Sequence, residues 1–470
     1  MQLKDITDTD LALEITGITA DSREVEKGFV FASLNDDIYI ADAIKKGAVA
    51  VIASKNSVIE NDGNEVKVIY ANNPAKVYAK AVARYFGAVP QHLAAITGTN
   101  GKTSIADFTR QMLGMLGKKA ASIGTLGVIK ENEAPLSLPN TTPNNVILHK
   151  ILHELAQENY NYAILEASSH GLEQQRLGGV EFEAAGFTNL TRDHLDYHKT
   201  FENYFAAKML LFGERLKKGG IAVLNADIEQ YARLREICES RGCQVWSYGK
   251  KGQELKLLKA IPQTEGQSLE IEYFGAKKTI EINLAGDFQA MNMLCALGLT
   301  AALSGKKDEL LELTKKIKGA KGRLELVGKT AKGAAVYIDY AHTPDALENV
   351  LRSLREHTAG RLIALFGCGG NRDKGKRPIM GQIANDLADV VYVTDDNPRF
   401  EDADIIRQEI MAACPKGVNI KGRALAIKEA IVNAENGDVV VLAGKGHESG
   451  QYIKGEILPF SDHVEVLKNL

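Results

Sequence analysis

Apolar and polar positions along the chain follow the pattern expected of strands separated by helices. Short, almost continuous apolar runs are typical of buried strands, and stretches with an apolar residue every three or four positions are typical of amphipathic helices. In the first ninety residues, strands are expected at 28–34 and 48–54, and helices at Ile40–Lys46 and Pro74–Tyr85. This order predicts a small α/β unit at the beginning of the chain.

The same alternation continues after GAVPQH, a glycine- and proline-containing segment that marks a first domain boundary. Apolar runs that predict strands lie at 93–98, 161–168, 184–190 and 219–226. Helical spacing is found at Thr103–Leu116, Asn144–Asn159 and Phe201–Lys217. We therefore expect a parallel sheet with helices on both faces.

A second boundary is expected at 315–323, where KKIKGAKGR reads as a solvated linker. Four further β-rich runs follow at 334–342, 361–369, 389–396 and 438–446, with helical spacing at Asp345–Arg355 and Asp404–Ala413. The chain is thus predicted to be α/β, with three domains at 1–89, 90–319 and 320–470, the last of them doubly wound. Ligands of doubly wound sheets bind beyond the carboxyl ends of the strands, and a polar loop follows each of these four runs.

Composition narrows the classes of function. Sixty acidic and 57 basic residues give a net charge of −3, so we expect no nucleic-acid partner. The N-terminal sequence MQLKDITDTD lacks the pattern of a secretion signal, and the chain holds no uninterrupted apolar run of about 18 residues, so no membrane insertion is expected. Five scattered cysteines without a CxxC pair indicate free thiols and a cytoplasmic protein: Cys238, Cys243, Cys295, Cys368 and Cys414.

The segment TGTNGKTS, Thr97–Ser104, follows an expected strand and precedes an expected helix. Its backbone N–H groups and the helix N-terminus could bind phosphate, while Lys102 could reach the terminal phosphates and Thr103 could bind Mg²⁺. The common phosphate-loop pattern has its first glycine at the position of Ile96, whereas here the glycine is Gly98. A plain glycine turn is the alternative interpretation.

Two polar segments follow the next strands of this region. Glu166 lies near the end of the run NYAILEAS, and the loop Asn189–His198 contains His194 between two aspartates. Carboxylate oxygens beside a phosphate loop suit Mg²⁺, and a histidine among acidic residues suits a metal or a substrate. A single histidine or glutamate is otherwise more often structural.

Together, TGTNGKTS, EASSHGLEQQRL, NLTRDHLDYH and YFAAKMLLF resemble the Mur ligase family, ATP-dependent amide-forming enzymes of peptidoglycan precursor synthesis. In the last domain, DYAHTPDALEN, FGCGGNRDKGKRPIMG, TDDNPRFED and GKGHE are similar to the members that form the tripeptide precursor. The resemblance covers nearly the whole chain. It implies a monomeric ligase of cell-wall growth, and hence of cell shape and division, whose three domains bind the UDP end of the nucleotide sugar, ATP and the incoming amino acid.

The resemblance also implies a nucleotide and metal site. The residues implied for ATP are Gly98, Thr99, Asn100, Gly101, Lys102, Thr103, Ser104, Asn292, Arg323 and Asp339. The residues implied for Mg²⁺ are Thr103, Glu166, His194 and Lys208. The family carbamylates the lysine at the position of Lys208, which converts a cationic amine into an anion. Lys102, Glu166, His194 and Lys208 are the implied catalytic residues, and Gln289 stands where the family usually has a second asparagine.

For the nucleotide sugar, the resemblance implies Ser22, within the DSR element Asp21–Arg23, near the uridine. The segment after FASL, beginning at Asn35, is shorter than the family's usual glycine- and histidine-containing loop. The residues implied for the muramoyl dipeptide are Asn140, Thr141, Thr142, Ser168, Gln174 and Arg176. A solvated helix charge is the other interpretation of Arg176.

The sequence DNPR, Asp396–Arg399, resembles the signature of members that add meso-diaminopimelate instead of L-lysine. Diaminopimelate carries one more, distal carboxylate, and an arginine offers that group a planar, bidentate partner. The residues implied for this site are Arg372, Asp396, Asn397, Pro398, Arg399, Gly444 and Glu448. A plain turn is the alternative for DNPR.

The implied reaction activates the D-glutamate γ-carboxylate of UDP-N-acetylmuramoyl-L-alanyl-D-glutamate with ATP, giving an acyl phosphate that the amine of meso-diaminopimelate attacks. Within the family, the alternatives are a lysine-adding ligase and an enzyme similar to folylpolyglutamate synthetase. Outside it, they are a phosphate-loop kinase or GTPase and a non-catalytic nucleotide-binding descendant.

Overall fold

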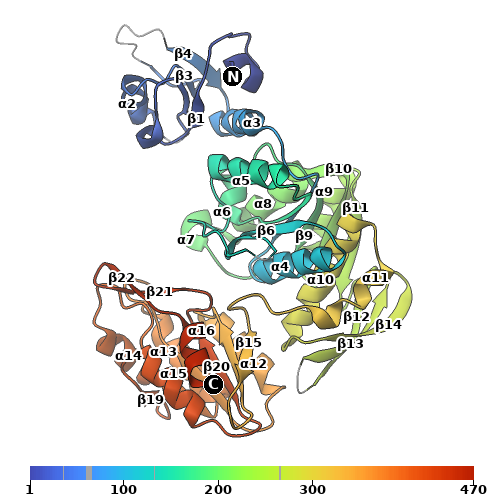
Figure 1. Ribbon diagram of the computed structural model, residues 1–470, viewed down its shortest axis with the longest axis vertical. Coiled ribbons are helices and arrows are strands. Elements are labelled where there is room, and N and C mark those ends of the chain that lie inside the picture. The colour runs from blue at the N-terminus through green and yellow to red at the C-terminus, as the bar shows by residue number, and fades with distance from the viewer. Residues whose placement is uncertain (35, 60–65, 132, 264–265) are drawn as a thin grey trace. The chain divides into compact units, whose positions relative to one another are not determined.

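Figure 1 shows the computed structural model, which describes residues 1–34, 36–59, 66–131, 133–263 and 266–470. The chain forms two compact units: Met1–Leu255 with Leu294–Leu310, and Lys256–Met293 with Leu311–Leu470. The first residue of the loop after FASL, Asn35, lies outside the described residues. Among the residues described, no helix is both long enough and apolar enough to cross a bilayer.

The N-terminal part of the first unit contains a parallel sheet with the strand order β1-β2-β3-β4. Its elements are β1 (Gly17–Thr19), β2 (Phe29–Ala32), β3 (Ala50–Ser54), β4 (Lys67–Ala71), α1 (Leu3–Ile6), α2 (Ile40–Lys45) and α3 (Pro74–Phe86). The two predicted strands are confirmed as β2 and β3. The sequence analysis missed β4, because only Ala71 of this strand is buried and its apolar pattern is correspondingly weak.

The larger sheet of the first unit has the order β11-β10-β9-β5-β8-β6-β7 and is parallel except for the pairing of β7 with β6. Its strands are β5 (His92–Thr97), β6 (Ala120–Gly124), β7 (Gly127–Ile129), β8 (Tyr162–Glu166), β9 (Phe182–Phe187), β10 (Leu216–Asn225) and β11 (Gln244–Gly249). Its helices are α4 (Lys102–Met115), α5 (Asn145–Gln157), α6 (Ser169–Glu173), α7 (Leu195–His198), α8 (Phe201–Leu210) and α9 (Tyr231–Ser240).

The predicted helix Phe201–Lys217 is wrong at its C-terminal end. Helix α8 ends at Leu210, a π-helical turn spans Leu211–Arg215, and β10 begins at Leu216. Leu211, Phe212 and Leu216 are all buried, so the helical spacing of apolar residues continues past the helix. Leu216 is buried as a strand residue opposite Phe182 of β9, which spacing alone could not show.

The second unit contains the neighbouring strands β12, β13 and β14 and a doubly wound sheet with the order β15-β16-β20-β17-β18-β19. The strands are β12 (Leu255–Pro262), β13 (Gln267–Tyr273), β14 (Ala276–Ile282), β15 (Glu325–Lys329), β16 (Ala335–Asp339), β17 (Leu362–Phe366), β18 (Val390–Val393), β19 (Val418–Asn419), β20 (Val439–Ala443), β21 (Gly450–Ile453) and β22 (Glu456–Pro459). The helices are α12 (Pro344–Arg355), α13 (Lys376–Leu387), α14 (Ala403–Met411), α15 (Arg423–Val432) and α16 (Asp462–Asn469); α10 (Asp287–Ser304) and α11 (Asp308–Leu311) contain residues of both units.

The four predicted strands of this region are confirmed as β16, β17, β18 and β20, which pair in parallel. Each is almost entirely buried, because α-helices cover the sheet.

Helix α12 shows how the sequence specifies one of these helices. The Thr343 hydroxyl accepts a hydrogen bond from the Ala346 N–H, Pro344 occupies the first turn, and the buried residues Leu347, Val350, Leu351 and Leu354 recur at helical spacing.

The basic segment 315–323 is only partly the solvated linker that its composition indicates. Its lysines are exposed, but Ile317 and Ala320 are buried. The apolar residues between the lysines therefore anchor this segment to the body of the second unit.

Candidate active site

The predicted phosphate loop connects β5 to α4. Gly101 adopts a positive φ of 88°, and no side chain caps the N-terminus of the helix that follows. The N–H groups of the first turn are therefore available to an anion. The Lys102 ammonium donates hydrogen bonds to the carbonyl oxygens of Gly98 (2.9 Å) and Thr99 (2.8 Å), which places its charge over the loop.

Residues after β9 hold the loop in shape. The Thr99 N–H donates to the Asn189 carbonyl oxygen, and the Asn100 N–H donates to the Asn189 side-chain oxygen, both at 2.9 Å. The Thr188 hydroxyl donates to the Asn100 carbonyl oxygen at 2.6 Å. A Cβ on Gly98 would lie 1.9 Å from that hydroxyl, and Gly98 has a φ of 141°, so both space and backbone conformation require glycine.

Glu166 lies at the end of β8, where its carboxylate meets the start of α4. The carboxylate accepts hydrogen bonds from the Thr103 hydroxyl (2.9 Å) and from the Thr125 N–H (2.8 Å) and hydroxyl (3.1 Å). A hydroxyl and a carboxylate are the hard oxygen donors that Mg²⁺ prefers, so Thr103 and Glu166 fit the predicted metal. The sequence analysis missed Thr125, although a hydroxyl directly after the neighbouring strand β6 was a usable signal.

Lys208 projects from α8 into the interior of the same region. Its side chain is 1% exposed, its ammonium donates to the Gly98 carbonyl oxygen at 2.8 Å, and it lies over the Tyr204 ring at 4.5 Å. Burial, reinforced by the positive charge of Lys102, lowers the pKa of Lys208 well below its ordinary value. An amine with a lowered pKa is neutral more often, and only a neutral amine can react with carbon dioxide.

His194 belongs to an aromatic cluster beside Lys208. Its ring lies 4.8 Å from that of His170 and 6.1 Å from that of Tyr204. The structure thus brings Thr103 into contact with Glu166, and it places both His194 and Lys208 next to the Tyr204 ring. Within the described ranges, no group of three or more His, Cys, Asp or Glu side chains is arranged to hold a metal ion.

The residues predicted for the muramoyl dipeptide are mostly brought together around Glu166. The Thr142 hydroxyl donates to the Glu166 carbonyl oxygen (2.8 Å) and accepts from the Ser168 hydroxyl (3.0 Å). The Arg176 guanidinium donates to the Thr142 carbonyl oxygen (2.8 Å) and to the Gln174 side-chain oxygen (2.7 Å). Burial lowers the pKa of Arg176, so this residue is not simply a solvated helix charge.

The other residues predicted for the nucleotide sugar are less closely held. Thr141 shares a hydrogen bond of 3.0 Å with the Thr125 hydroxyl, whereas Asn140 is exposed. Ser22 is buried in a 3₁₀ turn, where its carbonyl oxygen accepts a hydrogen bond of 2.9 Å from the Lys46 ammonium. Asp21 and Arg23 form a surface ion pair on either side of it, which lowers the pKa of Asp21 to about 2.

In the second unit, the loops after β18 and β20 form a charged cluster. The Asn397 side-chain oxygen accepts from the Lys445 ammonium and from the Tyr452 N–H, both at 3.1 Å, and its amide N–H donates to Glu448 at 2.9 Å. The Lys445 ammonium also donates to Glu448 at 3.1 Å. Lys445 is fully buried and was missed, although it lies within the GKGHE motif.

Asp396 lies at the centre of this cluster. Its carboxylate is buried, burial raises its pKa, and its Oδ1 atom has no hydrogen-bond partner among the described residues; the Lys445 ammonium is 3.7 Å away. Gly444 lies nearby and donates its N–H to the Asp339 carbonyl oxygen at 3.1 Å, while Pro398 is buried. A buried carboxylate oxygen without a partner suits a ligand that carries an ammonium group.

Arg399 has an unusual backbone conformation for its residue type, with a φ of 54°. Its N–H donates to the Tyr452 carbonyl oxygen at 2.9 Å, and its guanidinium donates to the Gly370 carbonyl oxygen at 2.9 Å. One of its guanidinium nitrogens is thereby fixed, which orients the others. Arg372, on the loop after β17, is exposed.

The residues of the second unit predicted for the nucleotide also lie close together. The Asn292 amide donates to the Gln289 side-chain oxygen at 3.0 Å, and the Gln289 amide donates to the Arg323 carbonyl oxygen at 3.4 Å. The Arg323 guanidinium lies 4.5 Å from the centre of the Tyr340 ring. The Asp339 carboxylate is buried, which raises its pKa, and it accepts two backbone N–H groups.

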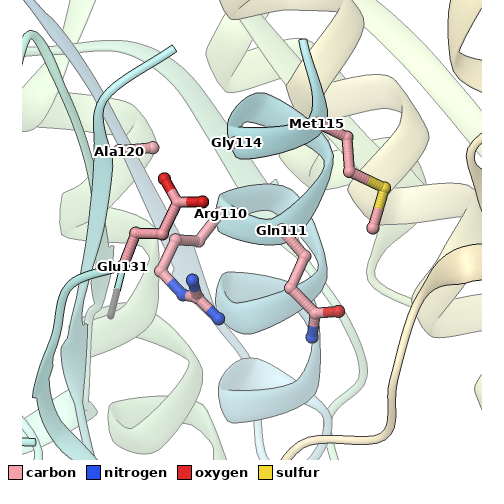
Figure 2. A pocket seen from close by; sticks show the side chains of 6 residues that line it. All are labelled: Arg110, Gln111, Gly114, Met115, Ala120 and Glu131. Atoms are coloured by element: carbon pink, nitrogen blue, oxygen red, sulfur yellow. The ribbon is translucent and has the colours of Figure 1, made fainter. Parts of the chain in front are cut away.

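A separate cavity of about 230 Å³ lies against α4. Figure 2 shows Arg110, Gln111 and Met115 projecting from this helix, with Ala120 and Glu131 on the other side of the cavity. None of the residues predicted for catalysis or binding lines it, so we assign it no role.

Comparison with known families and proteins identifies the class of this chain. A family model described as "Mur ligase middle domain" matches residues 96–300, and one described as "Mur ligase, glutamate ligase domain" matches residues 322–446. The MurF ligase from Thermotoga maritima, solved in complex with ADP, has a TM-score of 0.62 at 19% identity, covering 98% of this chain and 97% of that chain. At this identity, the likeness shows the fold alone.

Closer similarity is found with proteins named UDP-N-acetylmuramoyl-L-alanyl-D-glutamate--2,6-diaminopimelate ligase. The protein from Brucella melitensis biotype 1 is 48% identical over 97% of this chain and 93% of its own length. The protein from Caulobacter vibrioides is 45% identical over 97% and 95%. A solved structure with this name is 31% identical, has a TM-score of 0.74 and covers 100% of this chain and 98% of that chain. The chain therefore belongs to the Mur ligase family, whose members are ATP-dependent ligases that form amide bonds.

Proposed function

We propose that this chain adds meso-diaminopimelate to UDP-N-acetylmuramoyl-L-alanyl-D-glutamate in the cytoplasmic synthesis of peptidoglycan precursors. The observation that carries this proposal is the 48% identity, over nearly the whole chain, with a relative named for that reaction. The charged cluster around Asp396 and the fixed guanidinium of Arg399 support it, because together they offer partners for an ammonium and for a carboxylate.

In the first step, an oxygen of the D-glutamate γ-carboxylate attacks the γ-phosphorus of ATP. A new P–O bond forms, the bond to ADP breaks, and the product is an acyl phosphate. Lys102 and the N–H groups at the start of α4 offset the negative charge of the transferred group. In the second step, the amine of diaminopimelate attacks the acyl carbon, and the tetrahedral intermediate expels phosphate and loses a proton.

Thr103, Glu166, His194 and a carbamylated Lys208 are the proposed ligands of Mg²⁺, which would neutralise phosphate charge when bound. The lowered pKa of Lys208 supports carbamylation, since the neutral amine forms a bond to the carbon of carbon dioxide and releases a proton. The buried position of Lys208 would protect the product from water.

The substrate contacts are proposed by region. Ser22 contacts the uridine end, and the dipeptide is held by Asn140, Thr141, Thr142, Ser168, Gln174 and Arg176. Gly98–Ser104, Asn292, Arg323 and Asp339 contact ATP. Diaminopimelate is held by Arg372, Asp396, Asn397, Pro398, Arg399, Gly444 and Glu448. We also propose that the protein is a monomer with domains at 1–89, 90–319 and 320–470.

The test is ADP release, with the mass of the product, from the UDP-muramoyl dipeptide, ATP and Mg²⁺ with either meso-diaminopimelate or L-lysine. We expect ADP and a tripeptide product that depend on diaminopimelate. Preference for lysine would keep the ligase but refute the assignment of the amino acid. An absence of turnover with both amino acids would refute the proposed function.

A further inference from the structure

The two arginines proposed to hold diaminopimelate lie on different loops of the second unit. Arg372 follows β17 and Arg399 follows β18. The loops are directly joined: the Gly370 N–H donates to the Asn397 carbonyl oxygen at 2.9 Å, and the Arg399 guanidinium donates back to the Gly370 carbonyl oxygen at 2.9 Å. The Phe400 N–H also donates to the Asn371 side-chain oxygen at 3.0 Å.

There is no spare room between these loops. A Cβ on Gly370 would lie 2.0 Å from the Pro398 carbonyl oxygen, so even alanine would force the loops apart. The separation of Arg372 and Arg399 is therefore set by the contacts between the loops rather than by the two side chains alone.

The ion pair between Glu401 and Arg377 contacts both loops. Glu401, two residues after Arg399, accepts hydrogen bonds from the Asn371 N–H and from both terminal nitrogens of Arg377, at 3.1 and 3.2 Å. Arg377 is fully buried on α13 and also donates to the Gly369 carbonyl oxygen at 3.2 Å. The pair thus contacts the first loop on both sides of Gly370 and the second loop just beyond Arg399.

The charge of this pair does not change in the physiological range. The hydrogen bonds from Arg377 and from the Asn371 N–H lower the pKa of Glu401 to about 2. Arg377 has a second carboxylate partner, Glu409 of α14, at 2.7 Å. No hydrogen bond or ion pair joins Glu409 to either loop among the described residues, so it offers a matched control.

We propose that Glu401 and Arg377 are positioning residues that set the separation of Arg372 and Arg399, and through it the preference of the site for an amino acid with a distal carboxylate. This inference rests on the proposed function, because it takes the two arginines as the partners of that carboxylate. Two guanidinium groups can share one carboxylate only over a narrow range of separations. A displacement of about 1 Å in a positioning group can change a rate by about a hundredfold.

The test compares the wild type with Glu401→Gln and Glu409→Gln, using ADP release and the mass of the product. Glutamine keeps the size of the side chain and an acceptor for the Asn371 N–H, but it removes the negative charge through which Arg377 is paired with the second loop. For Glu401→Gln we expect KM for diaminopimelate to rise by about 10- to 100-fold, with KM for ATP unchanged. KM for L-lysine, measured with lysine supplied up to high concentrations, should also be unchanged. The preference for diaminopimelate over lysine should therefore fall. Glu409→Gln should stay within about threefold of the wild type.

The outcomes separate this inference from the proposed function. A wild type inactive with diaminopimelate refutes the function, and with it the inference. If the wild type is active, two outcomes refute the inference alone. One is an equal rise in KM for diaminopimelate in Glu401→Gln and Glu409→Gln, and the other is an equal rise in KM for diaminopimelate and for ATP in Glu401→Gln. If Glu401→Gln does not fold, Arg377→Lys is the second variant, because lysine keeps the charge but lacks the planar fork that reaches Glu401 and the Gly369 carbonyl oxygen together. It should raise KM for diaminopimelate and leave KM for ATP unchanged; an unchanged KM for diaminopimelate would refute the inference.

Discussion

The phosphate loop of the first unit and the DNPR loop of the second unit are held in shape by different kinds of interaction. Backbone groups, hydroxyls and amides from Thr188 and Asn189 hold the phosphate loop. Ion pairs and charged hydrogen bonds, with Arg377 and Lys445 fully buried, hold the DNPR loop. The difference corresponds to the two tasks proposed for these loops. The phosphate loop binds phosphate, for which fixed N–H groups are sufficient. The DNPR loop selects one amino acid, which requires long charged side chains held at set positions.

This comparison predicts two kinds of defect. Substitutions around the phosphate loop should lower the rate with every amino acid. Substitutions around the DNPR loop should change which amino acid is used while leaving the use of ATP intact.

The largest effect is expected for Lys208→Ala. This variant removes the amine proposed to carry a carbamate, so kcat should fall by about three orders of magnitude with diaminopimelate and lysine alike. Steady-state ADP release measures this fall. Small carboxylic acids at high concentration should restore part of the activity by supplying the missing anion. Full activity without rescue would remove the carbamate from the mechanism.

The next largest effect is expected for Arg399→Ala. Removing one partner of a buried ion pair costs about 3–5 kcal/mol. Because Arg399 is only partly buried, we expect a loss at the lower end of this range, which corresponds to about two orders of magnitude in affinity for diaminopimelate. Binding of diaminopimelate and of ATP can be measured separately by calorimetry. Equal losses for both ligands would mean that Arg399 is structural, and Arg352→Ala, at an exposed ion pair on α12, is the control.

The smallest effect concerns stability and pH, and it sharpens the contrast by testing a half-buried ionisable group, His447, beside the DNPR site. Burial, together with the charge of Arg323, lowers the pKa of His447 from 6.5 to about 4. Between these values, the unfolded chain binds a proton that the folded protein does not, so stability falls as the pH falls from 6.5 towards 4.

His447→Gln should remove this contribution. Between about pH 7 and pH 4.5, the free energy of unfolding of the variant should fall by about 2 kcal/mol less than that of the wild type, after allowance for the partial exposure of the ring. Urea unfolding at the two pH values measures the difference. Parallel losses in variant and wild type would show that His447 does not contribute to acid sensitivity.

Much of the fold and several parts of the site could be predicted from local sequence patterns. Buried parallel strands such as β16 and β20 are continuous apolar runs, and the phosphate loop is defined by residues that are adjacent in sequence. The strands β13 and β14 were missed because charged residues such as Glu270 and Glu281 alternate with their buried positions.

The residues missed at the site have a different cause. Lys445 and Arg377 are fully buried where they meet carboxylates distant in the sequence, Asp396 and Glu401 respectively. In sequence, a lysine or an arginine is usually a surface residue. Thr125 likewise gains its role from Glu166, which lies 41 positions away. Such pairings depend on which strands become neighbours, and that information is not present in any local pattern.

The contact between Gly98 and Thr188 also constrains how this sequence can drift over evolutionary time. Any side chain at position 98 collides with the Thr188 hydroxyl, so an exchange of Gly98 first requires a smaller residue at position 188, and the strain of its φ of 141° would still remain. That first exchange would release the Asn100 carbonyl oxygen from its donor. The two sites are therefore epistatic, and a lineage could pass through them in one order only.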